Sequence, residues 1–287
     1  MTDDVSVEVR PGLNMAAYRT AGGGGTPVLC IPGLTRNAAD FEDFAPQAAA
    51  ATGRDVYAVS LIGRGRSDYD PVYLNYKPDT YRDDILACMD ALGIARAIFV
   101  GTSLGGIVTM LTAAQAPARV AAAVINDVGP ELAPEGIIRI AGYVGARAAG
   151  ADEPARDLDE AAARIRAINE PAFPGRDPDF WRLFARRTFR QEADGRWRLD
   201  YDPGIGKALL EVGPAPDLWG PFAALRPIPT LVVRGAISDL LTPPIIERMR
   251  SAHPGFAYVE VGGVGHAPTL TEPDAIAAIM PFLERAD

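Results

Sequence analysis

The stretch that decides the fold is Ala97-Ile98-Phe99-Val100-Gly101-Thr102-Ser103-Leu104-Gly105-Gly106. Its first four residues are wholly apolar and predict a buried strand, and residues 104–116 are apolar almost all round, which predicts a buried helix. Between them, Ser103 must lie on a sharp, strained turn that projects its hydroxyl above the end of the strand. Gly101 and Gly105 lie two residues before and after the serine, where the absence of a side chain lets backbone segments approach closely.

Outward from this stretch, short apolar runs alternate with segments of helical periodicity. The predicted strands are 5–10, 15–20, 28–31, 55–61, 97–100, 120–125, 230–234 and 257–261, and the predicted helices among them are 38–51, 81–92, 104–116, 245–250 and 275–285. Wholly apolar strands separated by helices indicate a sheet whose two faces are both covered. The fold class is therefore α/β, with a mostly parallel central sheet flanked by helices.

This alternation is interrupted between residues 131 and 222. Here the sequence has no strong strand run, many arginines and all three tryptophans, and it predicts helices at 137–149, 158–168, 179–189 and 205–212. The simplest account is a core formed by residues 1–130 and 223–287, with residues 131–222 inserted as a helical unit.

Composition excludes several kinds of partner. The 287-residue chain has a formal net charge of −9, which argues against nucleic acid or an anionic membrane, because phosphate binding needs a basic face. The chain has two histidines and two cysteines, and the spacings typical of zinc ligands are missing. Cys30 and Cys88 both lie in apolar patterns and are expected to be buried, reduced thiols.

Nothing in the sequence predicts a membrane segment. No apolar stretch reaches the roughly 18 to 20 residues needed to cross a bilayer. The first residues, MTDDVSVEVR, are acidic and lack the apolar region of a secretory signal, so we expect a cytoplasmic protein. The oligomeric state does not follow from the sequence.

The turn Gly101-Thr102-Ser103-Leu104-Gly105, in its strand–turn–helix context, resembles the nucleophile elbow of the α/β-hydrolase family. The resemblance covers nearly the whole chain outside the insertion. A serine, an acid and a histidine also follow one another along the chain in the family's order. It implies that Ser103 is a nucleophile and that His266, in the loop 262–268 after the last predicted strand, is the general base. An imidazole suits that task because its pKa lies near 6.5. The other histidine, His253, is expected to be an exposed loop residue.

Two residues compete for the role of the acid. Asp239 follows the predicted strand 230–234 and occupies the place where the family usually carries its acid. Asp127 follows the strand 120–125, where some family members place it. We favour Asp239 as the carboxylate that orients His266, and expect Asp127 to brace the entrance to the insertion.

The resemblance also implies an oxyanion hole of two backbone N–H donors, those of Leu104 and Leu34. Leu34 lies in Pro32-Gly33-Leu34-Thr35-Arg36, where many relatives have His-Gly in place of Pro-Gly. The loop Gly63-Arg64-Gly65-Arg66-Ser67 matches a structural glycine loop of the family and is not a dinucleotide motif. Catalysis by serine through an acyl-enzyme requires no cofactor.

By the same resemblance, residues 131–222 are expected to form a cap that covers the active site. Its aromatic side chains could line a substrate pocket; the candidates are Tyr143, Trp181, Phe184 and Trp219. Four arginines of the cap, at 182, 186, 187 and 190, either attract a substrate carboxylate or form a solvated, ion-paired face.

Three functions are compatible with these residues. The favoured one is hydrolysis of a small-molecule carboxylic ester or lactone through an acyl-enzyme. The second is hydrolysis of a C–C bond in a ring-cleavage diketone, which would use the same three residues. The third is a non-enzymatic receptor for a small ligand. A substrate panel distinguishes the first two, and tight binding with slow turnover would indicate the third.

Overall fold

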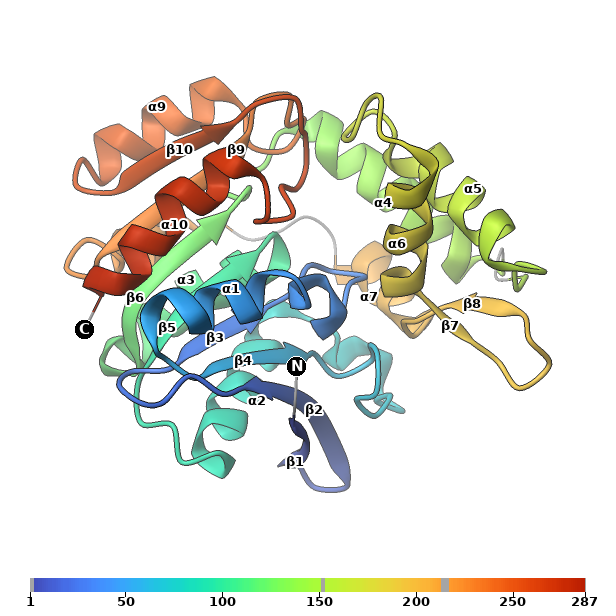
Figure 1. The fold of residues 1–287 in the computed structure, drawn as a ribbon, viewed down its shortest axis with the longest axis horizontal. Helices are drawn as coiled ribbons and strands as arrows, with labels where there is room; N and C mark the ends of the chain where they lie inside the picture. Colours follow the sequence, from blue (N-terminus) through green and yellow to red (C-terminus); the bar gives the residue numbers. More distant parts are fainter. Residues whose placement is uncertain (1–2, 151–152, 213–216, 287) are drawn as a thin grey trace.

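The computed structural model describes residues 3–150, 153–212 and 217–286. Its centre is an eight-stranded sheet with the strand order β1-β2-β4-β3-β5-β6-β9-β10 (Figure 1). The strands are β1 (Asp3–Arg10), β2 (Leu13–Thr20), β3 (Val28–Ile31), β4 (Val56–Ser60), β5 (Ala97–Thr102), β6 (Val120–Asn126), β9 (Thr230–Gly235) and β10 (Ala257–Val261). β1 and β2 form an antiparallel hairpin, β2 pairs antiparallel with β4, and every other neighbouring pair is parallel. The expectation of a mostly parallel sheet is confirmed.

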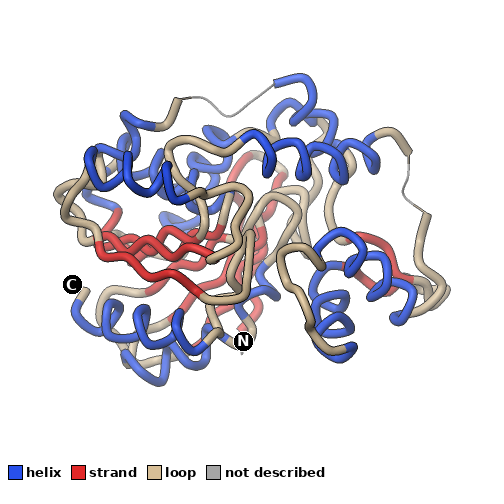
Figure 2. The backbone as a smooth tube through the Cα atoms, turned by 90° about the horizontal axis from the view of Figure 1, so that it is seen from above, coloured by secondary structure: helices blue, strands red, loops and turns tan. Residues whose placement is uncertain are grey.

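Helices cover both faces of the sheet, which lies between two layers of helix in Figure 2. The helices of the core are α1 (Phe44–Thr52), α2 (Pro78–Ala91), α3 (Leu104–Gln115), α8 (Trp219–Ala223), α9 (Pro243–Ala252) and α10 (Pro273–Arg285), with short 3-10 turns at Ala38–Phe41, Tyr73–Asn75 and Pro117–Arg119. Alternate residues of β3 show the layering. Leu29 and Ile31 pack with α2, α3, α8 and α9, whereas Val28 and Cys30 pack with α1 and α10. Because both faces are buried, all four positions of β3 are apolar.

The segment between β6 and β9 forms a separate group of elements at the right of Figure 1. It contains α4 (Pro134–Ala148), α5 (Leu158–Asn169), α6 (Pro178–Thr188) and α7 (Gly204–Val212). It also contains an antiparallel pair, β7 (Phe189–Gln191) and β8 (Trp197–Leu199), where no strand was predicted. Three residues are too few to show a period of two, which is why the pattern missed these strands. α8 follows and packs against α3 of the core.

Three smaller expectations have structural outcomes. Cys30 and Cys88 are buried free thiols, as expected. His253 was expected to be exposed and is buried, because its ring packs between Phe222 and Phe256 at 5.8 Å from each ring centre. Within the described ranges, no helix combines the length and the apolar character that crossing a membrane requires.

Candidate active site

The turn between β5 and α3 has the strained backbone that the sequence predicts. Ser103 has φ 52° and ψ −115°, a conformation that residues with a side chain rarely adopt. The flanking glycines are required by close approach. A Cβ on Gly101 would lie 2.3 Å from the Gly105 carbonyl oxygen, and a Cβ on Gly105 would lie 2.1 Å from the Ile31 carbonyl oxygen. Backbone from β3, β5 and α3 therefore meets directly beneath the serine.

The neighbouring strand places a second strained residue beside Ser103. In the parallel register of β5 and β6, Thr102 pairs with Asn126, so Ser103 and Asp127 leave the sheet side by side. The Ser103 N–H donates to the Asn126 carbonyl at 2.9 Å, and Asp127 also has a positive φ, 54°. Adjacent strands thus deliver a hydroxyl and a carboxylate to the same end of the sheet.

His266 connects these two residues. Its Nε2 lies 3.0 Å from Ser103 Oγ, and its Nδ1 lies 2.8 Å from Asp127 Oδ2. The expectation that Asp239 contacts His266 is therefore corrected, because the carboxylate at the imidazole belongs to Asp127. The physical reason is that Asp127 is buried beside the imidazole, whereas both carboxylate oxygens of Asp239 are paired with Arg139.

Asp127 is fully buried and each of its oxygens has a fixed donor. Oδ1 accepts from the Gly235 N–H at 2.8 Å, and Oδ2 accepts from Ser238 Oγ at 2.7 Å in addition to His266. Hydrogen bonds from such donors offset the cost of burying a carboxylate. The loop after β9, where the acid was expected, instead supplies donors to Asp127.

Asp239 contacts a different partner. It forms a two-point ion pair with Arg139 of α4, with N–O distances of 2.5 and 2.8 Å. Partial burial by itself would raise the pKa of Asp239, but the hydrogen bonds and charge of Arg139 outweigh it and lower that pKa below its ordinary value. Asp239 is thus an ionised residue that connects the core to α4.

Two polar residues that position the site, Asn126 and Ser238, belong to no motif in the sequence. Asn126 Nδ2 donates to Thr102 Oγ1 at 3.0 Å and to the Pro268 carbonyl at 2.8 Å, which ties the serine turn to the histidine loop. The one sequence signal for Asn126 was a polar residue at the end of an otherwise apolar strand. Ser238 had no signal, because its role depends on a partner 111 residues away.

The two expected oxyanion donors both line the cavity that contains Ser103. Leu104 is the first residue of α3, and an N–H group in the first turn of a helix has no acceptor within that helix. Leu34 lies in a turn closed by the Arg36 N–H donating to the Gly33 carbonyl at 3.2 Å. A Cβ on Gly33 would lie 3.6 Å from Ser103 Cβ, so this turn lies against the serine.

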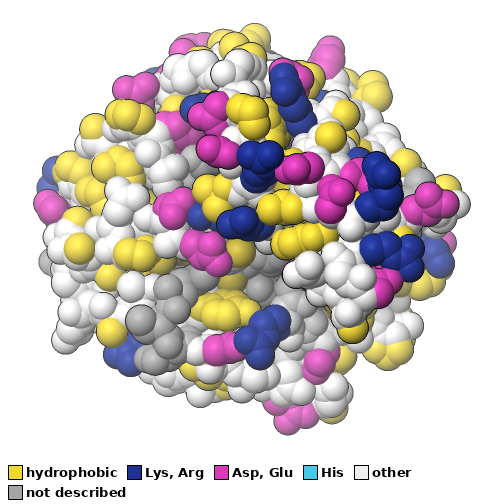
Figure 3. Space-filling view, turned by 45° about the vertical axis from the view of Figure 1, so that its right-hand side comes forward, with side chains coloured by type: hydrophobic (Ala, Val, Ile, Leu, Met, Phe, Trp, Pro, Cys, Tyr) yellow, Lys and Arg dark blue, Asp and Glu magenta, His cyan; other side chains and the backbone are white. Residues whose placement is uncertain are grey.

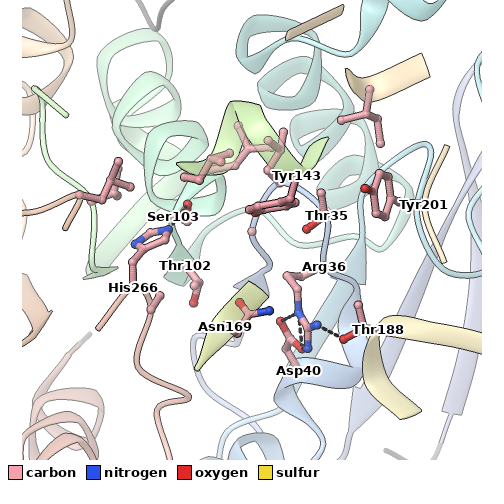
Figure 4. A pocket seen from close by; sticks show the side chains of 18 of the residues that line it. Thr35, Arg36, Asp40, Thr102, Ser103, Tyr143, Asn169, Thr188, Tyr201 and His266 are labelled. Carbon is pink, nitrogen blue, oxygen red and sulfur yellow. Dashed lines mark hydrogen bonds and ion pairs between the residues drawn. The ribbon is translucent and has the colours of Figure 1, made fainter. Parts of the chain in front are cut away.

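The cavity has a volume of about 540 Å³ and lies between the core and the 131–222 segment. Most of its wall is apolar, with side chains from α3, α4, α5, α6 and α7. In Figure 4, Ser103 and His266 face each other at one side, with Tyr143 and Tyr201 across from them. Burial raises the pKa of Tyr143, so its hydroxyl stays protonated at neutral pH.

Two of the four predicted pocket aromatics line this cavity, namely Tyr143 and Phe184. Trp181 is buried and packs against Phe173 and Phe184, at ring distances of 6.5 and 6.1 Å. Trp219 packs at the edge of the core against Phe222, at 6.3 Å. Helix periodicity does not distinguish these positions, because the aromatic residues of a cap serve both its own packing and the cavity.

Three of the four arginines of the stripe are in ion pairs. Arg182 pairs with Asp159 and Asp179, Arg187 with Asp43 and Glu42, and Arg190 with Asp200. Basic and acidic side chains lie close together over the face shown in Figure 3. These contacts favour the ion-paired alternative for the stripe, and of the three paired arginines Arg187 also lines the cavity.

The arrangement can move a proton. A histidine held between a serine hydroxyl and a buried carboxylate can accept the serine's proton, and the carboxylate stabilises the resulting imidazolium. In the part of the chain that the structure describes, no group of three or more His, Cys, Asp or Glu residues is arranged to hold a metal ion.

Known proteins resemble the chain over nearly its full length. A 3-hydroxybutyrate-oligomer hydrolase of Cupriavidus necator is 33% identical, covering 96% of this chain and 94% of its own. An esterase of Mycobacterium tuberculosis is 27% identical, covering 90% of this chain and 83% of its own. A crystal structure of an α/β hydrolase from Novosphingobium aromaticivorans superimposes with a TM-score of 0.91 at 41% identity, covering 99% and 98% of the two chains. Residues 28–279 match the model of the alpha/beta hydrolase family. The chain therefore belongs to the alpha/beta hydrolase family of hydrolases.

Proposed function

We propose that the protein is a serine hydrolase that cleaves a carboxylic ester through an acyl-enzyme intermediate. The observation that carries the proposal is the chain of two hydrogen bonds from Ser103 Oγ through His266 to Asp127, at 3.0 and 2.8 Å, on the wall of a mostly apolar cavity. Relatives that are named as an ester-oligomer hydrolase and as an esterase support the same class of reaction.

In the proposed reaction, Ser103 Oγ attacks the ester carbonyl carbon while His266 Nε2 takes the hydroxyl proton. The carbonyl oxygen becomes an oxyanion that accepts hydrogen bonds from the N–H groups of Leu104 and Leu34. The C–O bond to the alcohol then breaks, and His266 returns the proton to the departing alcohol oxygen. A water molecule next attacks the acyl-enzyme with His266 again as base, which releases the carboxylic acid and restores the serine.

The substrate proposed here is a short oligomer of a hydroxyalkanoic acid. The name of the relative from Cupriavidus necator suggests this class. A cavity of about 540 Å³ is in the range that encloses a drug-sized molecule, and its apolar wall suits alkyl side chains between ester groups. In this proposal, residues 131–222 are the cap that covers the acyl-binding cavity.

The test compares the wild type with Ser103→Ala on p-nitrophenyl esters of increasing acyl length and on a 3-hydroxybutyrate trimer, with product acids separated by chromatography. Ser251→Ala is the matched control, because Ser251 is exposed and its hydroxyl only caps the Glu247 carbonyl at 3.0 Å. We expect Ser103→Ala to lose at least about 10³-fold in kcat and Ser251→Ala to keep full activity. A folded wild type that cleaves none of these esters would contradict ester hydrolysis and leave C–C hydrolysis or ligand binding as the function.

A further inference from the structure

Arg64 is a charged residue in the interior of the molecule. Its exposed fraction is 0%, and its hydrogen-bond partners are neutral: the Leu34 and Ile62 carbonyls and the Tyr81 hydroxyl. Its guanidinium carbon also lies 4.6 Å from the ring centre of Tyr81, and within the described residues its Nη2 has no hydrogen-bond partner. A guanidinium stays charged at any ordinary pH, and burying it without a carboxylate is costly. Such a residue calls for an explanation beyond packing.

Arg64 is connected to the active site through a hydrogen bond to Leu34. Arg64 Nε donates to the Leu34 carbonyl at 2.8 Å, and Leu34 is the residue whose N–H is the proposed second oxyanion donor. The peptide group before Leu34 is held by the Arg36 N–H, which donates to the Gly33 carbonyl. The peptide group after Leu34 is held by Arg64, which donates to the Leu34 carbonyl. Because both peptide groups are held, the direction of the Leu34 N–H is held with them.

The backbone of the same loop is attached to the 131–222 segment. Arg64 forms an isolated β-bridge with Tyr201, the Gly65 N–H donates to the Asp200 carbonyl at 3.1 Å, and the Asp202 N–H donates to the Gly63 carbonyl at 2.8 Å. Tyr201 lines the cavity. One short loop thus contacts the oxyanion turn through a side chain and the segment over the cavity through its backbone.

Two glycines allow this loop to pack closely against its neighbours. Gly63 and Gly65 have φ of 89° and 56°, and a Cβ on either would lie 2.8 Å from a neighbouring side-chain atom, of Tyr76 or Ser60. The loop therefore packs closely against its neighbours, with no room for a side chain at either glycine.

We propose that Arg64 is a positioning residue that holds the oxyanion turn at Leu34 in register with the segment that covers the cavity. The proposal rests on the proposed function, because it assigns Arg64 a role through the Leu34 N–H. Since that N–H meets the substrate oxygen most strongly when it carries negative charge, loss of Arg64 should lower kcat and leave KM nearly unchanged.

The experiment compares Arg64→Met and Arg64→Lys with Arg66→Met in the full chain. Arg66 is the matched control because it lies two residues away, is mostly exposed and pairs with Asp4 at the surface. Each variant is assayed for kcat and KM, and for inhibition by two ketones of the same length. Trifluoromethyl pentyl ketone gives an oxyanion on Ser103, whereas 2-heptanone is neutral and binds without forming one. We expect Arg64→Met to lose about 10- to 100-fold in kcat and in affinity for the trifluoromethyl ketone, with affinity for 2-heptanone nearly unchanged.

Arg64→Lys keeps the charge but cannot reproduce the planar fork that reaches Leu34, Ile62 and Tyr81 together, so its losses should be intermediate. If Arg64→Met does not fold, Tyr81→Phe removes one partner of the guanidinium with little change in volume and should show the same pattern at smaller amplitude. Equal losses of affinity for the trifluoromethyl ketone and for 2-heptanone, or a kcat equal to that of Arg66→Met, would overturn the proposal. An inactive wild type would instead refute ester hydrolysis.

Discussion

At the scale of single residues, the acid at His266 is decided by which carboxylate is buried with donors around it. Asp127 is fully buried, accepts from Gly235 and Ser238, and lies 2.8 Å from His266 Nδ1. Asp239 is partly exposed and is already paired with Arg139. A carboxylate engaged by a guanidinium through both oxygens has little basicity left for a second partner. Asp127 is therefore the residue that can hold the imidazole in the tautomer the proposed reaction needs.

Asp127→Asn should lower kcat for ester hydrolysis by about 10³- to 10⁴-fold, because an amide does not stabilise the imidazolium and favours the wrong tautomer. The measurement is steady-state kinetics on the best p-nitrophenyl ester, with thermal unfolding to confirm that the variant folds. Asp239→Asn is the matched control, since it makes the same chemical change one strand away. We expect it to lose less than about 10-fold. A larger loss in Asp239→Asn than in Asp127→Asn would contradict this assignment.

At the scale of elements, the site depends on how closely β3, β5 and α3 approach one another. The amino end of α3 packs directly on the carbonyl of Ile31, the last residue of β3, and Gly105 is the point of contact. Gly106 of the same helix faces Val128, with only 2.4 Å between its ideal Cβ position and a Val128 methyl carbon. Two glycines in a row would weaken an isolated helix, so here tertiary packing outweighs helix propensity.

Gly105→Ala should destabilise the protein by about 3 kcal/mol or more, because a Cβ at 2.1 Å from a backbone oxygen forces two elements apart. Gly142→Ala in α4 is the matched control, since a Cβ there meets nothing within 4 Å. That change should stabilise the protein by about 0.5 to 1 kcal/mol through helix propensity. Urea unfolding midpoints measure both effects. A Gly105→Ala variant as stable as the wild type would show that α3 does not need this close approach.

At the scale of the whole molecule, the cavity exists because the 131–222 segment is held against the core at several separate places. Arg139 pairs with Asp239, Arg36 donates to Thr188, and the Gly265 N–H donates to the Ala172 carbonyl at 2.6 Å. The last contact joins the loop of His266 to the segment over it. A change in the wall contributed by this segment should therefore alter which substrates fit while leaving the chemistry at Ser103 intact.

Leu209→Trp should shift the preferred acyl length toward shorter esters, because Leu209 of α7 lines the cavity and a tryptophan there fills part of its volume. We expect kcat/KM for the longest ester that the wild type accepts to fall by about 10-fold or more, while kcat/KM for p-nitrophenyl acetate changes little. Ile138→Trp is the matched control, since Ile138 on α4 is 71% exposed. An unchanged chain-length profile in Leu209→Trp would indicate that acyl groups bind elsewhere.

Local sequence determined most of the fold. The apolar runs at β3, β5, β6 and β9 predicted buried parallel strands, and the bounds of α4, α5, α6 and α7 lie within a few residues of the predicted ones. Ser103 was identifiable from the turn between strand and helix, and His266 from its resemblance, in loop and chain order, to the family's histidine. The strands and helices follow from periodicity and turn chemistry, which act over a few residues.

Only the tertiary structure decided which carboxylate reaches His266, which aromatic residues line the cavity, and that Arg64 contacts the turn of Leu34. Asp127 and Asp239 both follow apolar strands, and the resemblance favoured Asp239. The structure decides for Asp127 because its carboxylate is buried at His266 Nδ1, whereas Arg139, from a helix 100 residues away in the chain, pairs with Asp239. Such choices depend on contacts between distant segments, which have no local pattern, since burial and ion pairing are properties of the packed molecule.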